Sequence, residues 1–175
     1  MNIVLKTLGV TLLVVALVAL FVVTEGFLPT HADEAPSFME KWIARKALHA
    51  ALEREAPQMK APIPADEANL SAGLNLYKVN CLLCHGASDG EASDVAAGLY
   101  QKPPQFAMRS MSDDPMGKIY WFIRHGVRLT GMPAFRATMD EKQLWQVTLF
   151  LRQMDALPPS VQMQWKAVPG AAEKE

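Results

Sequence analysis

The sequence predicts an all-helical protein, in which an apolar N-terminal helix precedes a helical globular unit. Two observations carry this prediction. The run from Leu8 to Val23, LGVTLLVVALVALFVV, contains no charged residue. Further along, apolar residues recur three and four positions apart, which is the spacing of one helix face. No segment alternates apolar and polar residues as a half-buried strand does.

The apolar run approaches the roughly 20 residues that a helix needs to cross a bilayer. Ile3 to Leu5 and Phe27-Leu28 extend it on both sides. A cleaved signal peptide is the alternative, since residues 30–32 offer small side chains for cleavage, but the apolar core exceeds the ~7–15 residues usual in a signal. We therefore predict that residues 1–30 are a transmembrane anchor or an uncleaved signal.

The anchor also gives an expected location. Lys6 precedes the apolar run and should keep the N-terminus inside, which sends the chain after residue 30 outside. The expected location is a bacterial inner membrane, crossed once, with the globular unit on the periplasmic side.

Residues 31–65 are predicted to form a helical neck and a proline-rich linker. Ser37 and Glu40 fit a capping box at the start of a helix that runs to about Glu55. Its apolar residues do not form one stripe, because Phe38, Met39, Trp42 and Ile43 favour one side and Leu48 and Leu52 another. The helix is either a spacer packed on its own domain or a surface for a partner or the membrane. The three prolines of APQMKAPIPADE then break it.

The main unit is predicted to cover residues 66–157. One helix leads into the cysteines, with Leu70, Gly73, Leu74, Tyr77 and Cys81 at helical spacing. Residues 86–112 have little periodicity and are expected to be loop with one short helix.

Two more helices are predicted to follow. One begins at Asp114-Pro115, with proline at its first position, and ends at Gly126. The last begins at Thr138, where Thr138 and Glu141 fit a second capping box. Its apolar stripe is Leu144, Val147, Leu151 and Met154. Residues 158–175 are expected to be a flexible tail, in which Trp165 is the one candidate for a fixed contact.

The segment VNCLLCHG contains both cysteines of the chain, Cys81 and Cys84, followed at once by His85. A structural zinc site needs four ligands, and these residues supply three. A thioredoxin-like pair needs a βαβ setting that the helical pattern excludes. A disulfide remains possible outside the cytoplasm. The pattern C-x-x-C-H is that of covalent haem attachment, with thioether bonds from both cysteines and His85 as an iron ligand. One haem c is the expected cofactor.

A sixth iron ligand has to be found among ten methionines. Met132 stands out, because it lies between Gly131 and Pro133 in LTGMPAF, outside any predicted helix. Met108 and Met111 are the alternatives. The remaining methionines are better explained as core or surface residues.

These features together resemble the class I c-type cytochromes, which carry one haem with histidine and methionine as axial ligands. The resemblance covers about residues 66–157 and rests on three segments: GLNLYKVNCLLCHG, IYWFIRHGVRLTGMPAF and DEKQLWQVTLFLRQM. It implies that the first and last helices of the domain cross where Gly73 allows close approach. Tyr77 would pack there against Val147, Phe150 and Leu151. It also implies that the carbonyl of Pro103 or Pro104 accepts a hydrogen bond from His85. An anchor and a neck are not part of the minimal fold, which suggests a tethered member of the family.

The expected function is single-electron transfer, as a carrier for or subunit of a respiratory membrane complex, and not enzymatic turnover. Two axial protein ligands leave no open position for a substrate. A net charge of −1 gives no reason to expect nucleic acid as a partner. The first alternative is a gas sensor or small peroxidase, in which Met132 dissociates. The second is a structural subunit with an incidental haem. Arg124, His125 and Arg128 could face haem propionates or a docking partner, or be solvated surface.

Overall fold

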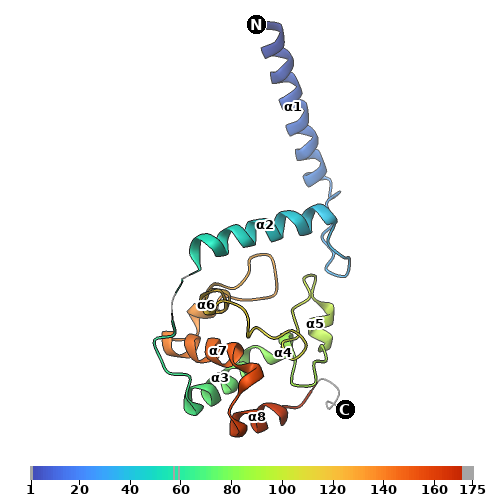
Figure 1. The fold of residues 1–175 in the computed structure, drawn as a ribbon. Helices are drawn as coiled ribbons and strands as arrows, with labels where there is room; N and C mark the ends of the chain where they lie inside the picture. Colours follow the sequence, from blue (N-terminus) through green and yellow to red (C-terminus); the bar gives the residue numbers. More distant parts are fainter. Residues whose placement is uncertain (1, 57, 59, 171–175) are drawn as a thin grey trace. The chain divides into compact units, whose positions relative to one another are not determined.

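The computed structural model describes residues 2–56, 58 and 60–170, and it divides after Ala32 into two units. In the first unit, α1 (Asn2–Thr24) is a single helix with a mean hydropathy of 2.7 over its most apolar part, long and apolar enough to cross a membrane. Phe27 and Leu28 lie beyond its end. In the second unit, every regular element among the described residues is a helix, as the sequence predicts (Figure 1).

The neck helix α2 (Phe38–Glu55) begins as the sequence predicts, since the Ser37 side chain accepts a hydrogen bond from the Glu40 amide. The second half of the predicted capping box is wrong. The Glu40 carboxylate accepts a hydrogen bond from the Tyr100 hydroxyl instead. Leu52 is the one buried residue of α2, and α2 packs against α6 (Met116–His125).

The centre of the second unit is the crossing of α3 (Glu67–Asn80) and α7 (Glu141–Arg152). Gly73 lies at the contact, where an added Cβ atom would come within 2.1 Å of the Gln146 carbonyl oxygen. Tyr77 packs against Phe150 with 5.5 Å between ring centroids. The predicted close approach at Gly73 is therefore present, and Val147, Phe150 and Leu151 are all buried.

The segment between the crossing helices carries three shorter ones. The turn α4 (Leu82–His85) follows α3 directly, and α5 (Asp94–Gly98) is the one short helix expected in the loop. Helix α6 packs on α7 with Ile119, Tyr120 and Ile123 buried. Pro115 is the residue before the first helical position, one place earlier than the sequence suggested.

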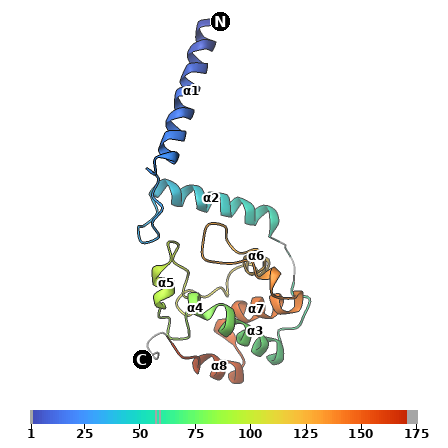
Figure 2. The same cartoon turned by 180° about the vertical axis from the view of Figure 1, so that it is seen from behind.

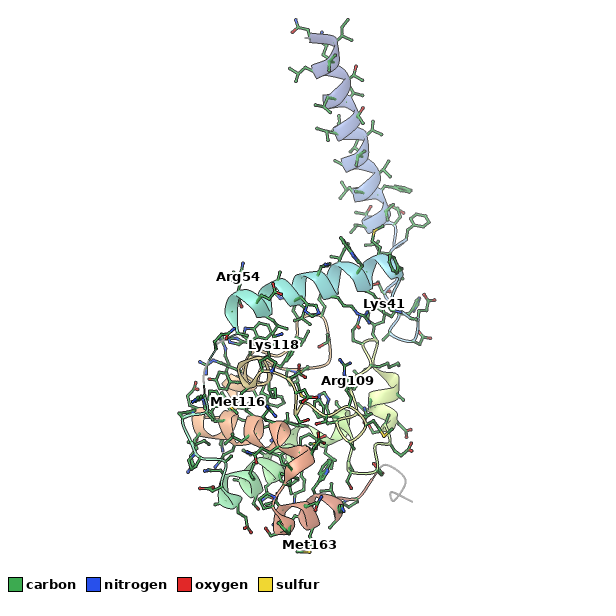
Figure 3. The ribbon with its side chains drawn as sticks, in the orientation of Figure 1. Lys41, Arg54, Arg109, Met116, Lys118 and Met163 are labelled. Atoms are coloured by element: carbon green, nitrogen blue, oxygen red, sulfur yellow. The ribbon has the colours of Figure 1, made fainter. Side chains whose placement is uncertain are left out.

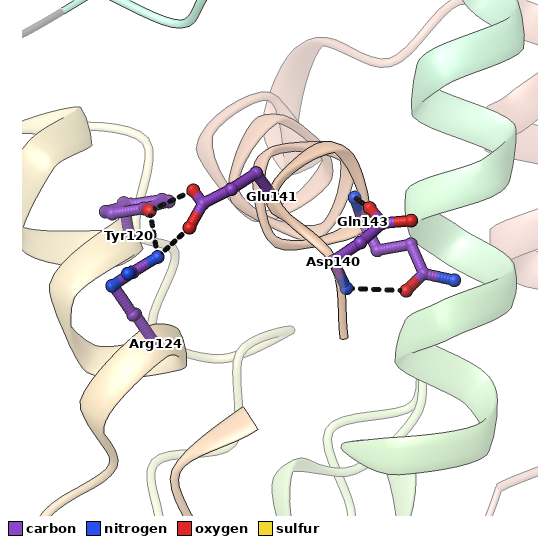
Figure 4. A network of polar contacts seen from close by, with 5 residues as sticks. All are labelled: Tyr120, Arg124, Asp140, Glu141 and Gln143. Atoms are coloured by element: carbon purple, nitrogen blue, oxygen red, sulfur yellow. Dashed lines mark hydrogen bonds and ion pairs between the residues drawn. The ribbon is translucent and has the colours of Figure 1, made fainter. Parts of the chain in front are cut away.

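The capping box predicted at Thr138 is displaced by two residues. A 3₁₀ turn, η1 (Phe135–Ala137), is followed by Thr138, whose backbone amide donates to the Phe135 carbonyl. The capping box of α7 is formed by Asp140 and Gln143, and each side chain bonds the other residue's backbone amide (Figure 4). Helix α7 ends at Arg152, and Met154 opens a second 3₁₀ turn, η2 (Met154–Ala156).

The prediction of a flexible tail is wrong for its described part, because residues 159–166 form α8 (Pro159–Lys166), packed on α3 (Figure 2). Val161, Trp165 and Val168 are buried. The Trp165 ring contacts Tyr77 and Phe150 edge-on, at 5.5 and 5.7 Å between centroids. Residues 171–175 lie outside the described residues.

Candidate functional site

The predicted attachment motif folds into a single turn. Cys81 caps both α3 and α4, and its carbonyl accepts hydrogen bonds from the amides of Cys84 and His85 at 3.0 and 2.8 Å. The three side chains therefore project from one helical turn. The two thiols are not joined in a disulfide. Burial, and then the nearby Cys84, raises the pKa of the Cys81 thiol to about 12, which disfavours thiolate chemistry.

The His85 ring has a fixed tautomer and orientation. Its Nδ1 atom lies 2.9 Å from the carbonyl oxygen of Pro104. Because a carbonyl can only accept, Nδ1 carries the proton and Nε2 keeps its lone pair. The Phe106 ring stacks on the imidazole, with 4.3 Å between centroids and 6° between planes. Burial lowers the pKa of His85 despite the Pro104 bond, so the ring is held in the neutral form that binds iron.

A cavity of about 280 Å³ opens beside this turn. Cys81, Cys84 and His85 line it together with Met132 and Met111. Most of the other lining residues are apolar: Leu99, Pro103, Pro104, Phe106, Ile119, Phe122, Ile123, Val127, Pro133, Phe135 and Leu151. Two thiols, an imidazole with a free Nε2 and a thioether around one apolar cavity fit a covalently attached haem, which needs those donors and a dry pocket.

Met132 is presented by a turn with several internal constraints. Gly126 ends α6 with φ of 65°, and a Cβ atom there would lie 2.6 Å from the Met132 carbonyl oxygen. The Met132 amide bonds the Thr130 hydroxyl at 3.1 Å, and its carbonyl accepts from the Val127 amide at 3.2 Å. Leu129 has φ of 62°, which is unusual for a leucine, and its side chain is 92% exposed.

The two alternative methionines differ. Met108 is 77% exposed and does not line the cavity. Met111 does line it and packs against the core. Of the candidates chosen from the sequence, the structure therefore brings Met132 and Met111, but not Met108, to the cavity.

Two residues of the site were missed by sequence reasoning. Gln105 donates from its side-chain amide to the carbonyls of Cys84 and Pro103, which ties the loop to the attachment turn. Phe106 stacks on His85 and donates its amide to the His85 carbonyl. Their neighbours Pro103 and Pro104 were the available signal, but no spacing rule indicates which side chain of QKPPQF turns inward.

The cavity is not lined by the basic residues at and just after the end of α6, which are Arg124, His125 and Arg128. Arg124 forms an ion pair with Glu141 and bonds the Tyr120 hydroxyl at 2.8 Å (Figure 4). Tyr120 also donates to Glu141 at 2.5 Å. His125 and Arg128 are exposed. Of the sequence alternatives, a solvated surface contact between α6 and α7 describes Arg124 best.

Residues 68–151 match the family model described as cytochrome c oxidase, cbb3-type, subunit III. Over this segment the chain is similar to a c-type cytochrome domain. The match runs from the first turn of α3 to the end of α7, so it includes the attachment turn, the cavity and the Met132 loop. Comparison with curated proteins and with solved structures found no match. A domain of this kind implies covalently bound haem c, and the cavity and its donors fit that group.

Proposed function

We propose that the protein is a membrane-tethered cytochrome with one haem, which passes single electrons to or from a respiratory complex. The observation that carries this proposal is the shared cavity of Cys81, Cys84, His85 and Met132. Haem c supplies reversible one-electron chemistry, and a methionine opposite a histidine raises its reduction potential.

Each residue has a role in this proposal. Cys81 and Cys84 hold the group to one turn of the chain. His85 offers Nε2 in a fixed orientation, because Pro104 bonds Nδ1 and Phe106 lies against the ring face. The apolar walls exclude water, and the constrained turn around Met132 restricts movement of its sulfur. A site that moves little between oxidation states is suited to electron transfer.

The cavity lining also bears on the sensor and peroxidase alternative. Among its lining residues, the side chains with a titratable group are Cys81, Cys84, His85 and Lys102. The first three belong to the attachment turn, which leaves Lys102 as the one candidate for proton transfer. Lys102 bonds the Ala97 carbonyl. Peroxide chemistry needs a positioned acid or base, so carriage is favoured.

The membrane part of the proposal rests on α1. The helix is long and apolar enough to span a bilayer, and Lys6 near its start favours an inside N-terminus. The cytochrome domain would then lie on the periplasmic side of a bacterial inner membrane. We propose a redox protein of the respiratory chain as the partner, in agreement with the oxidase-subunit description of the matching family.

The test is Met132→Ala in the full chain, with Met111→Ala as the matched control from the same cavity. We expect the first change to lower the midpoint potential and to give a high-spin or water-ligated ferric spectrum. The control should keep both properties. Intact mass of denatured wild type should exceed the chain mass by one haem. An unchanged spectrum in Met132→Ala would refute the ligand, and haem extracted by acidic solvent would refute covalent attachment.

Carbon monoxide distinguishes carriage from gas chemistry. Reduced wild type at neutral pH should bind it slowly or not at all, because Met132 has to leave first. The same sample should exchange electrons rapidly with a small redox dye. Rapid carbon monoxide binding by intact protein would instead support the sensor or peroxidase reading.

A further inference from the structure

The first two turns of α2 expose four large apolar side chains. Phe38, Met39, Trp42 and Ile43 are 84, 68, 54 and 53% exposed. At 3.6 residues per turn their positions fall within an arc of about 140°. A contiguous apolar group of this kind on a surface marks a site that contacts something other than water.

The opposite part of α2 is already occupied. Leu52 is buried, Leu48 is half-buried, and both lie outside the apolar arc. Glu40, also outside the arc, accepts a hydrogen bond from the Tyr100 hydroxyl. The helix is therefore fixed to the cytochrome domain by one side, and the apolar arc faces away from that contact.

Positive charge borders the arc along one edge. Arg45 and Lys46 are exposed and lie beside and within the arc in the next turn. Lys41, near the N-terminal end of the helix (Figure 3), is exposed but lies about 60° outside the arc, on the side of Leu48. Glu40 is the acidic residue among these turns, and it is engaged by Tyr100. Aromatic and aliphatic residues flanked by lysine and arginine are typical of helices that lie in a membrane interface. Long basic side chains can extend past apolar neighbours to reach headgroups.

If α1 anchors the chain in the membrane, as proposed above, the short connection between α1 and α2 keeps α2 close to the bilayer. Between Thr24 and Phe38 lie residues 25–37, and an extended segment of that length spans at most about 45 Å. A surface tethered at this distance meets the lipid at a high effective concentration, so even a modest affinity is enough for binding.

We propose that the arc of Phe38, Met39, Trp42 and Ile43 lies on the phospholipid surface, with Arg45 and Lys46 at anionic headgroups. Helix α2 also contacts α6, which leads into the Met132 turn, and bonds Tyr100, a neighbour of the cavity-lining Leu99. Binding of α2 to lipid therefore orients the haem cavity relative to the membrane, so that one face of the domain is presented to the partner.

The test uses full-length holoprotein in the reduced state, in nanodiscs of phosphatidylcholine with phosphatidylglycerol. Single nitroxide labels are placed at Met39→Cys and, as the matched control, at Val79→Cys, an 83% exposed apolar position on α3. Power saturation of the nitroxide signal with oxygen and with a nickel chelate measures how deep each label lies in the bilayer. The label at 39 should lie about 5–10 Å into the interface, and the label at 79 should be in water. A third label, at Val15→Cys in α1, tests the anchor.

The outcomes are separable. A buried label at 15 with a water-accessible label at 39 overturns the α2 proposal and leaves the anchor intact. A water-accessible label at 15 overturns the anchor and the tether argument together. Protection of the label at 39 in native membranes, but not in lipid nanodiscs, assigns the arc to a protein and overturns the lipid proposal.

Two variants test the chemistry of the contact. Because the side chains are exposed, Phe38→Ser with Trp42→Ser should leave the haem spectrum unchanged while the label at 39 becomes as accessible as that at 79. Arg45→Glu with Lys46→Glu should make the label shallower when phosphatidylglycerol is present. An unchanged depth in the charge-reversed protein would refute the role of the headgroups.

Discussion

Replacing Gly73 with alanine tests whether the α3–α7 crossing holds the second unit together. The added Cβ atom would lie 2.1 Å from the Gln146 carbonyl oxygen and 2.9 Å from the Phe150 Cβ atom. Both are atoms of α7 that no rotamer change can move, so the helices must separate by roughly 1 Å to restore ordinary contact. Overpacking of a core costs about 1–3 kcal/mol, or more where backbone has to move. Alanine returns about 1 kcal/mol through its helix propensity. We expect a net loss of about 2 kcal/mol or more, because the obstacle is backbone.

The assay is denaturant and thermal unfolding of the ferric holoprotein, followed by circular dichroism and by haem absorption. A loss of 2 kcal/mol corresponds to a fall in Tm of roughly 10 °C for a domain of this size. Gly98→Ala is the matched control, since a Cβ atom there meets nothing within 4 Å. Equal stability of Gly73→Ala, Gly98→Ala and wild type would show that the close crossing is not needed.

Four further outcomes are expected. Gly126→Ala should weaken Met132 ligation, seen in the methionine-dependent charge-transfer band of the ferric protein, because alanine is strained at φ of 65° and would meet the Met132 carbonyl. Tyr77→Phe should destabilise the fold by about 1–3 kcal/mol in denaturant unfolding, since it leaves the buried Gly86 carbonyl, now bonded at 2.7 Å, without its donor. Phe106→Leu should reorient the imidazole and change the electron paramagnetic resonance g-values while covalent haem stays attached. Hydrogen bonds from Tyr120 and Arg124 lower the pKa of Glu141. The ionised carboxylate therefore stabilises the fold, by at most about 1 kcal/mol for an exposed pair, above the ordinary carboxyl pKa, and this stability is lost as pH falls through the lowered pKa. Glu141→Gln should remove this pH dependence of the free energy of unfolding.

The parts of the site that the sequence predicts are local in the chain. Cys81, Cys84 and His85 share one turn, so their spacing alone is enough to bring them together. Met132 is marked by the glycine and proline on either side of it. Its presence in the same cavity as His85 agrees with the prediction, while its bond to iron stays a prediction.

Two kinds of feature could not be predicted from the sequence. One is a helix start for which two sequence motifs fit equally well, and the other is a contact between residues far apart in the chain. The segment TMDEKQ satisfies the capping rule twice, at Thr138 with Glu141 and at Asp140 with Gln143. Thr138 caps the end of the preceding 3₁₀ turn, so the helix begins after Asp140, which forms the capping box. The Tyr100–Glu40 bond joins residues far apart in sequence, which no local pattern indicates. The order of the tail depends on distant contacts too, because Trp165 packs against Tyr77 and Phe150.

The aromatic cluster of Tyr77, Phe150 and Trp165 has a consequence for the order of assembly. Tyr77 lies in the helix that leads into Cys81, but its ring is enclosed by Trp165, a residue made much later. Contacts between such distant residues form slowly. We therefore expect the attachment turn to emerge and stay open while the rest of the chain is still being made. During that interval both thiols stay accessible, before the last helix closes over the crossing.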